Sequence, residues 1–211
     1  MSKNVDINLE NGKTWHGLAV AGCVLTAWAI AVAASAEMGV LKLIPPPAIA
    51  ALVALGIAAP VAAYLSLPSA RRFIDGLGLY PLTVFHIWRV PAGLVFFAYG
   101  FGGALPPLFW ILAGSGDLLV GLYAFRTFRA RDDIRFFSRF HLVGFADFIV
   151  AVGTGLTFTL LGDPRMDAIA ELPMALIPLF GVGVSGASHI IAFMILRRMR
   201  RTPFNAVRRR A

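Results

Sequence analysis

The sequence predicts an all-α membrane protein with six transmembrane helices, and two observations carry this prediction. Of the 211 residues, 58% are hydrophobic and only 14% are charged, with a mean hydropathy of +0.77. A water-soluble domain usually has about a quarter charged residues. Apolar runs of the length that crosses a bilayer as a helix recur along the whole chain. We therefore expect a single integral membrane domain over residues 1–211.

The first predicted span ends in Ala34, Ser35 and Ala36, which resembles a signal-peptidase site. Its apolar run is long and the leading segment is nearly neutral, so we favour an uncleaved anchor over a cleaved signal peptide. The predicted spans cover about 17–36, 47–66, 81–101, 108–124, 141–161 and 173–196, and a basic tail follows over 197–211.

The segments between the spans differ in composition. Prolines open the second span, where the missing N–H of the first helical turn costs little. Residues 67–80 are predicted to form an interfacial loop or a short helix, and residues 102–107 form a tight turn. The connection over 125–140 is rich in arginine, whereas the loop over 162–172 is mainly acidic.

The distribution of basic residues predicts the orientation. Sixteen of the 19 Lys and Arg residues fall on the side of the two termini, and only Lys42 and Arg165 fall in loops on the other side. The positive-inside rule then predicts a multi-pass membrane protein with both termini cytoplasmic. The same bias accounts for the net charge of +8, so we expect no nucleic-acid partner. The basic tail is expected to contact anionic lipid head groups of the bilayer.

Ionisable residues inside the spans define the candidate site. Such residues are costly in lipid and usually have a partner and a function. With a rise of 1.5 Å per residue, five of them reach a similar depth, roughly 8–13 Å from the cytoplasmic side. They come from four separate spans, and we predict that they form one ligand or proton site: His86, Arg89, Asp117, Asp147 and His189.

Two further residues have secondary roles in this prediction. Ser185 lies one helical turn before His189 and shares its face. His141 is placed at the cytoplasmic boundary of the fifth span, as a solvated interfacial histidine, with a role as a proton entry point as the lesser alternative. Because small residues let helices approach closely in lipid, we expect spans three to six to form a four-helix core. Spans one and two then lie outside that core.

Charge counting leaves several chemistries open. One Arg and two Asp give the site a net charge of −1 if its histidines are neutral, and a buried net charge is expensive. A proton, a metal ion or a cationic ligand would complete it. The plain alternative is that Arg89 pairs with one Asp, that the other Asp is protonated, and that the cluster only holds the helices together.

The chain has no nucleophile elbow, P-loop or H-E-x-x-H motif, and its single cysteine, Cys23, has no intrachain disulfide partner. Whether the protein is an enzyme is left open by the sequence.

Short motifs in spans three to six resemble an uncharacterised group of small polytopic bacterial inner-membrane proteins. The resemblance rests on Phe85 to Arg89, on Gly116-Asp117 with Val120-Gly121, and on the closing segment from Leu172-Pro173 and Ile177-Pro178 through His189 to Arg197-Arg198. It implies a bacterial inner membrane and an Arg–Asp–His site, and it carries no activity.

Three classes of function are compatible with these observations. Proton-linked transport or binding of a small ligand comes first, and with only six spans a transporter would work as a homodimer. The second is a redox protein that holds a b-type haem between His86 and His189, or a divalent metal with a carboxylate. The third is a structural or assembly subunit of a larger membrane complex.

Overall fold

The computed structural model describes the backbone of residues 2–208 and the side chains of residues 17–200. Within this part of the chain every regular element is helical, and six helical segments are long and apolar enough to cross a membrane. The predicted fold class, an all-α protein with six transmembrane helices, is confirmed. The spanning segments are Gly17–Glu37, Pro46–Ser66, Leu79–Phe101, Pro107–Phe128, Ile134–Leu160 and Ile177–Arg200.

Several spans are built from more than one helix, so the elements outnumber the spans. In chain order they are α1 (Ser2–Glu37), η1 (Val40–Leu43), α2 (Pro46–Ser66), α3 (Pro68–Leu77), α4 (Leu79–Val84), η2 (Phe85–Trp88), α5 (Arg89–Phe101), α6 (Pro107–Ala124), η3 (Phe125–Phe128), α7 (Ile134–Leu160), η4 (Pro164–Ala170), η5 (Ile177–Gly181) and α8 (Val182–Arg208).

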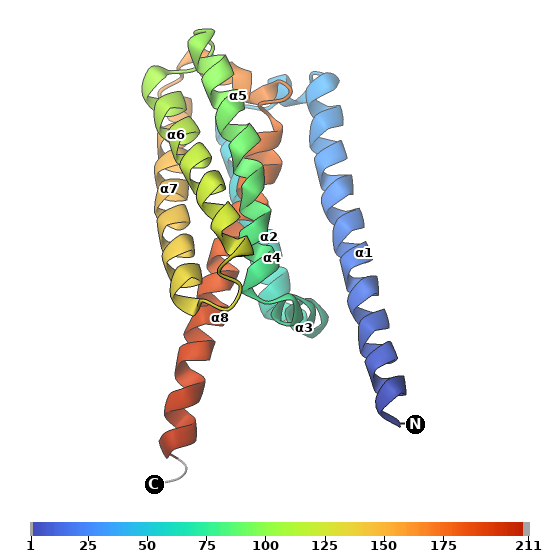
Figure 1. The fold of residues 1–211 in the computed structure, drawn as a ribbon. Coiled ribbons are helices and arrows are strands. Elements are labelled where there is room, and N and C mark those ends of the chain that lie inside the picture. Colours follow the sequence, from blue (N-terminus) through green and yellow to red (C-terminus); the bar gives the residue numbers. More distant parts are fainter. Residues whose placement is uncertain (1, 209–211) are drawn as a thin grey trace.

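Spans three to six form the four-helix core. Helix α5 packs on α6, α6 on α7 and α7 on α8, while α4 returns to α8 and closes the bundle (Figure 1). Glycines permit the closest crossing, between α5 and α6: a Cβ added at Gly93 would lie 2.8 Å from the carbonyl oxygen of Gly114. Backbones that approach this closely are typical of helices packed in lipid.

The first two spans lie outside this core, as predicted, and differ in how they attach. Helix α2 packs along α8, and α1 stands away from the bundle over most of its length (Figure 1). Helix α1 is attached mainly near Trp28, whose ring meets Phe180 edge-on with centroids 5.3 Å apart. The same indole fills a notch where Gly56 of α2 and Gly183 of α8 cross.

The fifth span begins at Ile134, seven residues before the predicted start at residue 141, so that boundary was wrong. The carboxylate of Asp133 accepts hydrogen bonds from the backbone N–H groups of Arg135 and Phe136, which caps the helix. The arginines that follow were read as part of a loop, but they lie in the first turns of α7. The basic tail also starts as helix, because α8 continues to Arg208.

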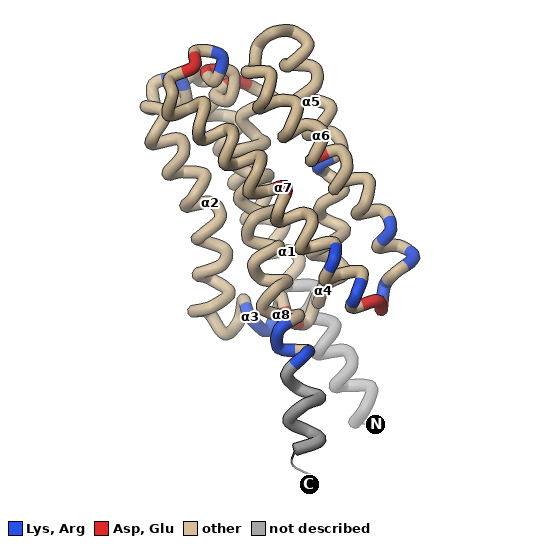
Figure 2. Tube along the Cα trace, turned by 90° about the vertical axis from the view of Figure 1, so that its left-hand side faces the viewer, with Lys and Arg blue, Asp and Glu red and all other residues tan. Residues whose placement is uncertain are grey.

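Lys and Arg gather at the end of the molecule where α3 lies and the described side chains of α8 end (Figure 2). There Asp75 of α3 joins three elements. It accepts a hydrogen bond from Tyr64 of α2 at 2.7 Å and pairs with Arg198 of α8 at 2.6 Å. At the other end a salt bridge of 2.7 Å joins Lys42 to Glu171.

Spans three and six each contain an irregular helical segment. The third span tightens into the 3₁₀ segment η2, and the backbone N–H of Arg89 bonds to the carbonyl of His86. Pro91 has no N–H to offer the carbonyl of Ile87, which explains why the α-helical pattern fails here. The sixth span begins as the π-helical segment η5, which contains Pro178. Such irregular turns are often found at functional sites, and here both lie beside a cavity.

Candidate binding site

Arg89 lies between two carboxylates in the middle of the bundle. Its Nε donates to Asp117 Oδ1 at 2.5 Å, and its Nη2 donates to Asp147 Oδ2. The arginine, from α5, thereby joins α6 and α7. A Cβ at Gly116 would collide with the carboxylate of Asp147, so the glycine leaves the space through which Asp147 reaches the arginine. These three residues are called the ion triad below.

The ion triad carries a net charge of −1 when both carboxylates are ionised. Arg89 is 3% exposed and Asp117 is 6% exposed, so water compensates this charge little. The third guanidinium nitrogen, Arg89 Nη1, is buried and donates to no acceptor among the described side chains and backbone. A buried group without its hydrogen bond costs about 1–3 kcal/mol, more when it is charged. The triad therefore has a free donor and an uncompensated negative charge.

A cavity of about 220 Å³ lies against the ion triad. One water needs only ~15 Å³ of such volume, so the cavity is large enough for an organic molecule. Arg89, Asp117, Ser185 and Thr159 are the polar residues that line it; the other residues are apolar and come from every helix around it. They include Val53, Phe96, Phe109, Phe148, Met174 and Val182.

The cavity reaches the outer surface of the bundle between α2 and α7. Ala54 of α2 and Leu156 of α7 both line it, and both are exposed, Leu156 by 40%. In a membrane this surface faces the hydrocarbon core. A molecule dissolved in the bilayer could thus enter sideways and meet the ion triad.

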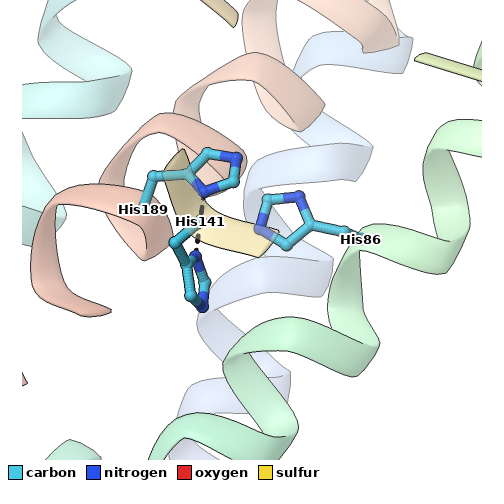
Figure 3. A group of neighbouring side chains, drawn as sticks. All are labelled: His86, His141 and His189. Atoms are coloured by element: carbon cyan, nitrogen blue, oxygen red, sulfur yellow. Dashed lines mark hydrogen bonds between the residues drawn. The ribbon is translucent and has the colours of Figure 1, made fainter. Parts of the chain in front are cut away.

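Three histidines, none of which lines the cavity, meet inside the bundle (Figure 3). His86 comes from η2, His141 from α7 and His189 from α8, and each is 0% exposed. The rings of His86 and His189 are stacked, with centroids 4.2 Å apart and planes 28° apart. His141 meets His189 edge-on, and their Nδ1 atoms are 2.9 Å apart. These residues are called the histidine triad.

Hydrogen bonds fix the proton positions on two of these rings. The Thr83 hydroxyl donates to the carbonyl of Leu79 at 2.9 Å, so it accepts from His141 Nε2, 3.1 Å away. Because a neutral imidazole has one N–H, His141 Nδ1 is then an acceptor. It accepts from Nδ1–H of His189, which leaves His189 Nε2 as a bare lone pair.

The same reasoning applies to the third ring. The Ser188 hydroxyl donates to the carbonyl of Ser185 at 2.8 Å and therefore accepts from His86 Nε2, also at 2.8 Å. This leaves His86 Nδ1 unprotonated. His86 Nδ1 and His189 Nε2 are both buried and have no donor among the described residues. The histidine triad thus presents two unused nitrogen lone pairs.

The structure brings the predicted site residues together in two adjoining groups. Arg89, Asp117 and Asp147 form the ion triad, and His86 and His189 belong to the histidine triad. Ser185 lies at the cavity wall, where it accepts a hydrogen bond of 3.1 Å from Trp88 Nε1.

His141 was interpreted as a solvated interfacial histidine, and that interpretation was wrong, since the residue is fully buried. The error follows from the boundary of the fifth span. Counted from Ile134, His141 lies about 10 Å into the helix, at the depth of the other site residues. Thr83, Trp88 and Ser188 were missed as site residues. The only signals were the i, i+3 spacing of Thr83 from His86 and the i, i+3 spacing of Ser188 from Ser185.

The stacked rings do not fit a haem. A bis-histidine haem places its iron and porphyrin between the two imidazoles. The rings of His86 and His189 are in direct face contact at 4.2 Å, so there is no layer between them for a macrocycle.

Comparison with known proteins places the chain in a family. Residues 46–197, well over half of the chain, match the family model described as Domain of unknown function (DUF8737). The matched region begins at the first residue of α2 and ends just past Leu196, so it contains both triads and the cavity and leaves α1 outside. No curated protein and no solved structure matches the chain. From the matched residues, the chain belongs to the DUF8737 family.

Proposed function

We propose that this protein binds a small lipid-soluble molecule with an uncharged oxygen acceptor and couples its movement to a proton on the ion triad. One observation carries the proposal: Arg89 lines the apolar cavity, and Nη1 of this same side chain is buried with a proton to donate and no acceptor. A ligand carbonyl or hydroxyl bound at this wall of the cavity would give the guanidinium an acceptor once Nη1 turns toward it.

The charge of the ion triad disfavours an anionic ligand. A carboxylate ligand would raise the net charge from −1 to −2 in a region with little water, which is unfavourable. A proton on Asp117 or Asp147 neutralises the triad, and it also weakens the hold of one carboxylate on Arg89. Binding of the ligand to Arg89 and protonation of a carboxylate would then assist each other, which is the linkage that a proton-coupled carrier needs.

The cavity argues against the alternative in which the ion triad only holds the helices together. An ion triad that served only to hold helices together would need no cavity beside it, and packed side chains would be more stable than a void. The cavity lies among five α-helices, α2, α5, α6, α7 and α8, that could have closed around it.

Membrane and orientation belong to the same proposal. We propose that the chain lies in a bacterial inner membrane with the arginine-rich end in the cytoplasm, so that the histidine triad is on the cytoplasmic side of the ion triad. Supporting this, basic residues gather at one end (Figure 2). As a six-span carrier the protein would act as a homodimer.

The binding proposal can be tested with the fluorescence of Trp88, which lines the cavity. A variant that carries Trp15→Phe, Trp28→Phe and Trp110→Phe keeps Trp88 alone, and it is reconstituted in nanodiscs. Bromododecanol, bromododecanoate and bromododecyl-trimethylammonium quench tryptophan and differ only in head group. We expect saturable quenching by the alcohol, and weaker quenching by the carboxylate that strengthens as the pH falls.

Two variants complete this test. Replacing Arg89, Asp117 and Asp147 all by Leu removes the hydrogen-bond donor. A hydrogen bond to a charged group contributes about 1.5–3 kcal/mol, so its loss should weaken ligand binding roughly ten- to a hundredfold. Val53→Phe fills the cavity and leaves the charges in place. Non-saturable quenching that is equal in all three proteins would show that the probe only dissolves in the bilayer, and the proposal would be abandoned.

A further inference from the structure

We propose that His86 and His189 ligate a transition-metal ion of the kind that imidazole prefers, zinc or copper, and that His141 supports the site through its hydrogen bond to His189. One nitrogen from each ring can be chosen so that all three lie within 4.8 Å of one another. Figure 3 shows the three rings converging from separate helices. None of them lines the cavity, so this site is distinct from the one proposed above.

The unused lone pairs are the first argument. Among the described side chains, buried polar atoms without a hydrogen-bond partner are few, and two of them are His86 Nδ1 and His189 Nε2. By the tautomers assigned above, both nitrogens are hydrogen-bond acceptors. Only a hydrogen-bond donor or a cation could satisfy them. Two bare imidazole nitrogens in a dry interior are suited to a cation that accepts electron pairs, as Zn²⁺ and copper ions do.

The second argument is how the opposite nitrogens are held. Histidines that bind metals almost always donate their other ring N–H to a fixed acceptor, which sets the tautomer and the ring orientation. His86 donates to Ser188, and His189 donates to His141. His141 in turn donates to Thr83, which is anchored on the backbone of its own helix. The triad therefore has the supporting hydrogen bonds expected of a metal site.

Charge agrees with this assignment. The ring of His189 packs directly against α7 at Gly144, where a Cβ would lie 2.6 Å from His189 Cε1 and 3.0 Å from His189 Nε2. The neighbouring ion triad has one more carboxylate than arginine. A cation at the histidines would offset that negative charge across a short distance in low dielectric.

The ligand atoms also select the class of ion. The histidine triad offers only nitrogen, whereas Mg²⁺ and Ca²⁺ require oxygen ligands. Rings that are stacked cannot both point at one ion, so binding requires rotation about χ2 of at least one ring, which is a soft torsion. Metal binding should therefore separate the stacked pair of His86 and His189.

The test uses the full chain, purified in detergent, stripped with a chelator and dialysed against Zn²⁺, Cu⁺ under reducing conditions, or Mg²⁺. We expect about one bound Zn²⁺ or Cu⁺ per chain, no retained Mg²⁺, and a rise of the thermal midpoint with the bound ion. Comparing the first two ions decides between zinc and copper. Absence of stoichiometric zinc and copper in the wild-type chain would overturn the proposal.

Variants locate the site. His86→Gln and His189→Gln keep an amide donor and remove a ligand, and each should lower the affinity by at least about tenfold, as loss of even supporting groups does. The fourth histidine of the sequence, His16, provides the control: His16→Gln should bind as the wild type does. X-ray absorption of the loaded wild type should show the outer-shell scattering of imidazole ligands, and sulfur ligands, absence of imidazole scattering, or binding that survives both triad variants would place the metal elsewhere and refute the assignment.

Discussion

Gly144 of α7 lies directly against the imidazole of His189 of α8. A Cβ at position 144 would approach ring atoms of His189 to 2.6 and 3.0 Å, closer than side chains normally pack. Because the ring is held by its hydrogen bond to His141, it cannot simply move away. The glycine is thus needed for the position of a site residue on another helix.

We predict that Gly144→Ala destabilises the protein by about 1–3 kcal/mol, the usual cost of forcing an extra methyl group into a packed interior. Gly153→Ala, on the same helix, is the matched control, because a Cβ there would meet nothing within 4 Å. That change should be neutral or stabilise α7 by up to ~1 kcal/mol, since alanine is the better helix former. Denaturation in detergent measures both variants, and equal stabilities would show that His189 is not confined by Gly144.

A second prediction concerns Arg89. Arg89→Leu alone leaves Asp117 and Asp147 facing each other without a counter-charge, and breaking a buried ion pair in this way costs about 3–5 kcal/mol. Replacing all three residues by Leu removes the charges together, and such apolar replacement is often neutral or stabilising. We therefore expect the triple variant to be more stable than the single variant.

The same pair of variants separates structural from functional roles. If the ion triad is a working site, the triple Leu variant folds and loses ligand binding and any cellular function, which complementation in the host would measure. A folded triple variant that complements fully would mean that the triad only holds the helices together.

The basic end of the molecule should show a measurable pH dependence. Desolvation acts to raise the pKa of Asp75, but hydrogen bonds from Arg198 and Tyr64 outweigh it, and the pKa is lowered from its ordinary value of 3.8. A carboxyl group with a lowered pKa stabilises the folded state above its unfolded pKa, and this contribution is lost as the pH falls below about 3.8. The group is partly exposed, so the effect is small, under about 1 kcal/mol.

As the pH drops from 5 toward 3, we expect the unfolding free energy of the wild type to fall more than that of Asp75→Asn. The difference should be under about 1 kcal/mol. Asp132→Asn removes an exposed carboxylate at the same end and serves as the control. If the curves of wild type and Asp75→Asn run parallel over this range, the contacts of Asp75 contribute nothing to stability.

The orientation can be tested with reporter fusions. Fusions at Asp132 and at Ala211 should read cytoplasmic, and fusions at Gly103 and Asp167 should read external, because the basic segments are retained inside. In the basic connection the fusion is best placed at residue 132, before the helix, since α7 begins at Ile134. Reversed signals at any two positions would contradict the proposed topology.

The number of spans and the residues of the ion triad were predictable from sequence, and the reason is physical. Twenty apolar residues have few alternatives to a membrane helix, and charges such as Arg89 and Asp117 inside one must find each other. Depth along a helix follows from the rise per residue, which is nearly constant. These facts predicted that Arg89, Asp117 and Asp147 meet, although the count for Asp147 started from residue 141 and α7 begins at Ile134.

The details that sequence did not reveal depend on local backbone and on packing between helices. The cap at Asp133 moves the start of α7 and so buries His141, which a count from the wrong boundary had placed at the interface. The partners Thr83 and Ser188 are ordinary hydroxyl residues whose role appears only when His141 and His86 face them. The cavity is equally invisible in sequence, since apolar residues that line a void and those that fill one look alike.

The 3₁₀ winding of η2 has a mechanical consequence. If its four residues rewound as α-helix, the segment would shorten by about 2 Å and turn by about 80°, because the two helix types differ in rise and in residues per turn. Thr83, before this segment, would then rotate relative to Arg89, after it, and His86, inside it, would turn through part of that rotation. The bond from His86 to Ser188 and the bond from Arg89 to Asp117 could not both survive that rotation. A single short segment thus makes the two triads mechanically dependent on each other.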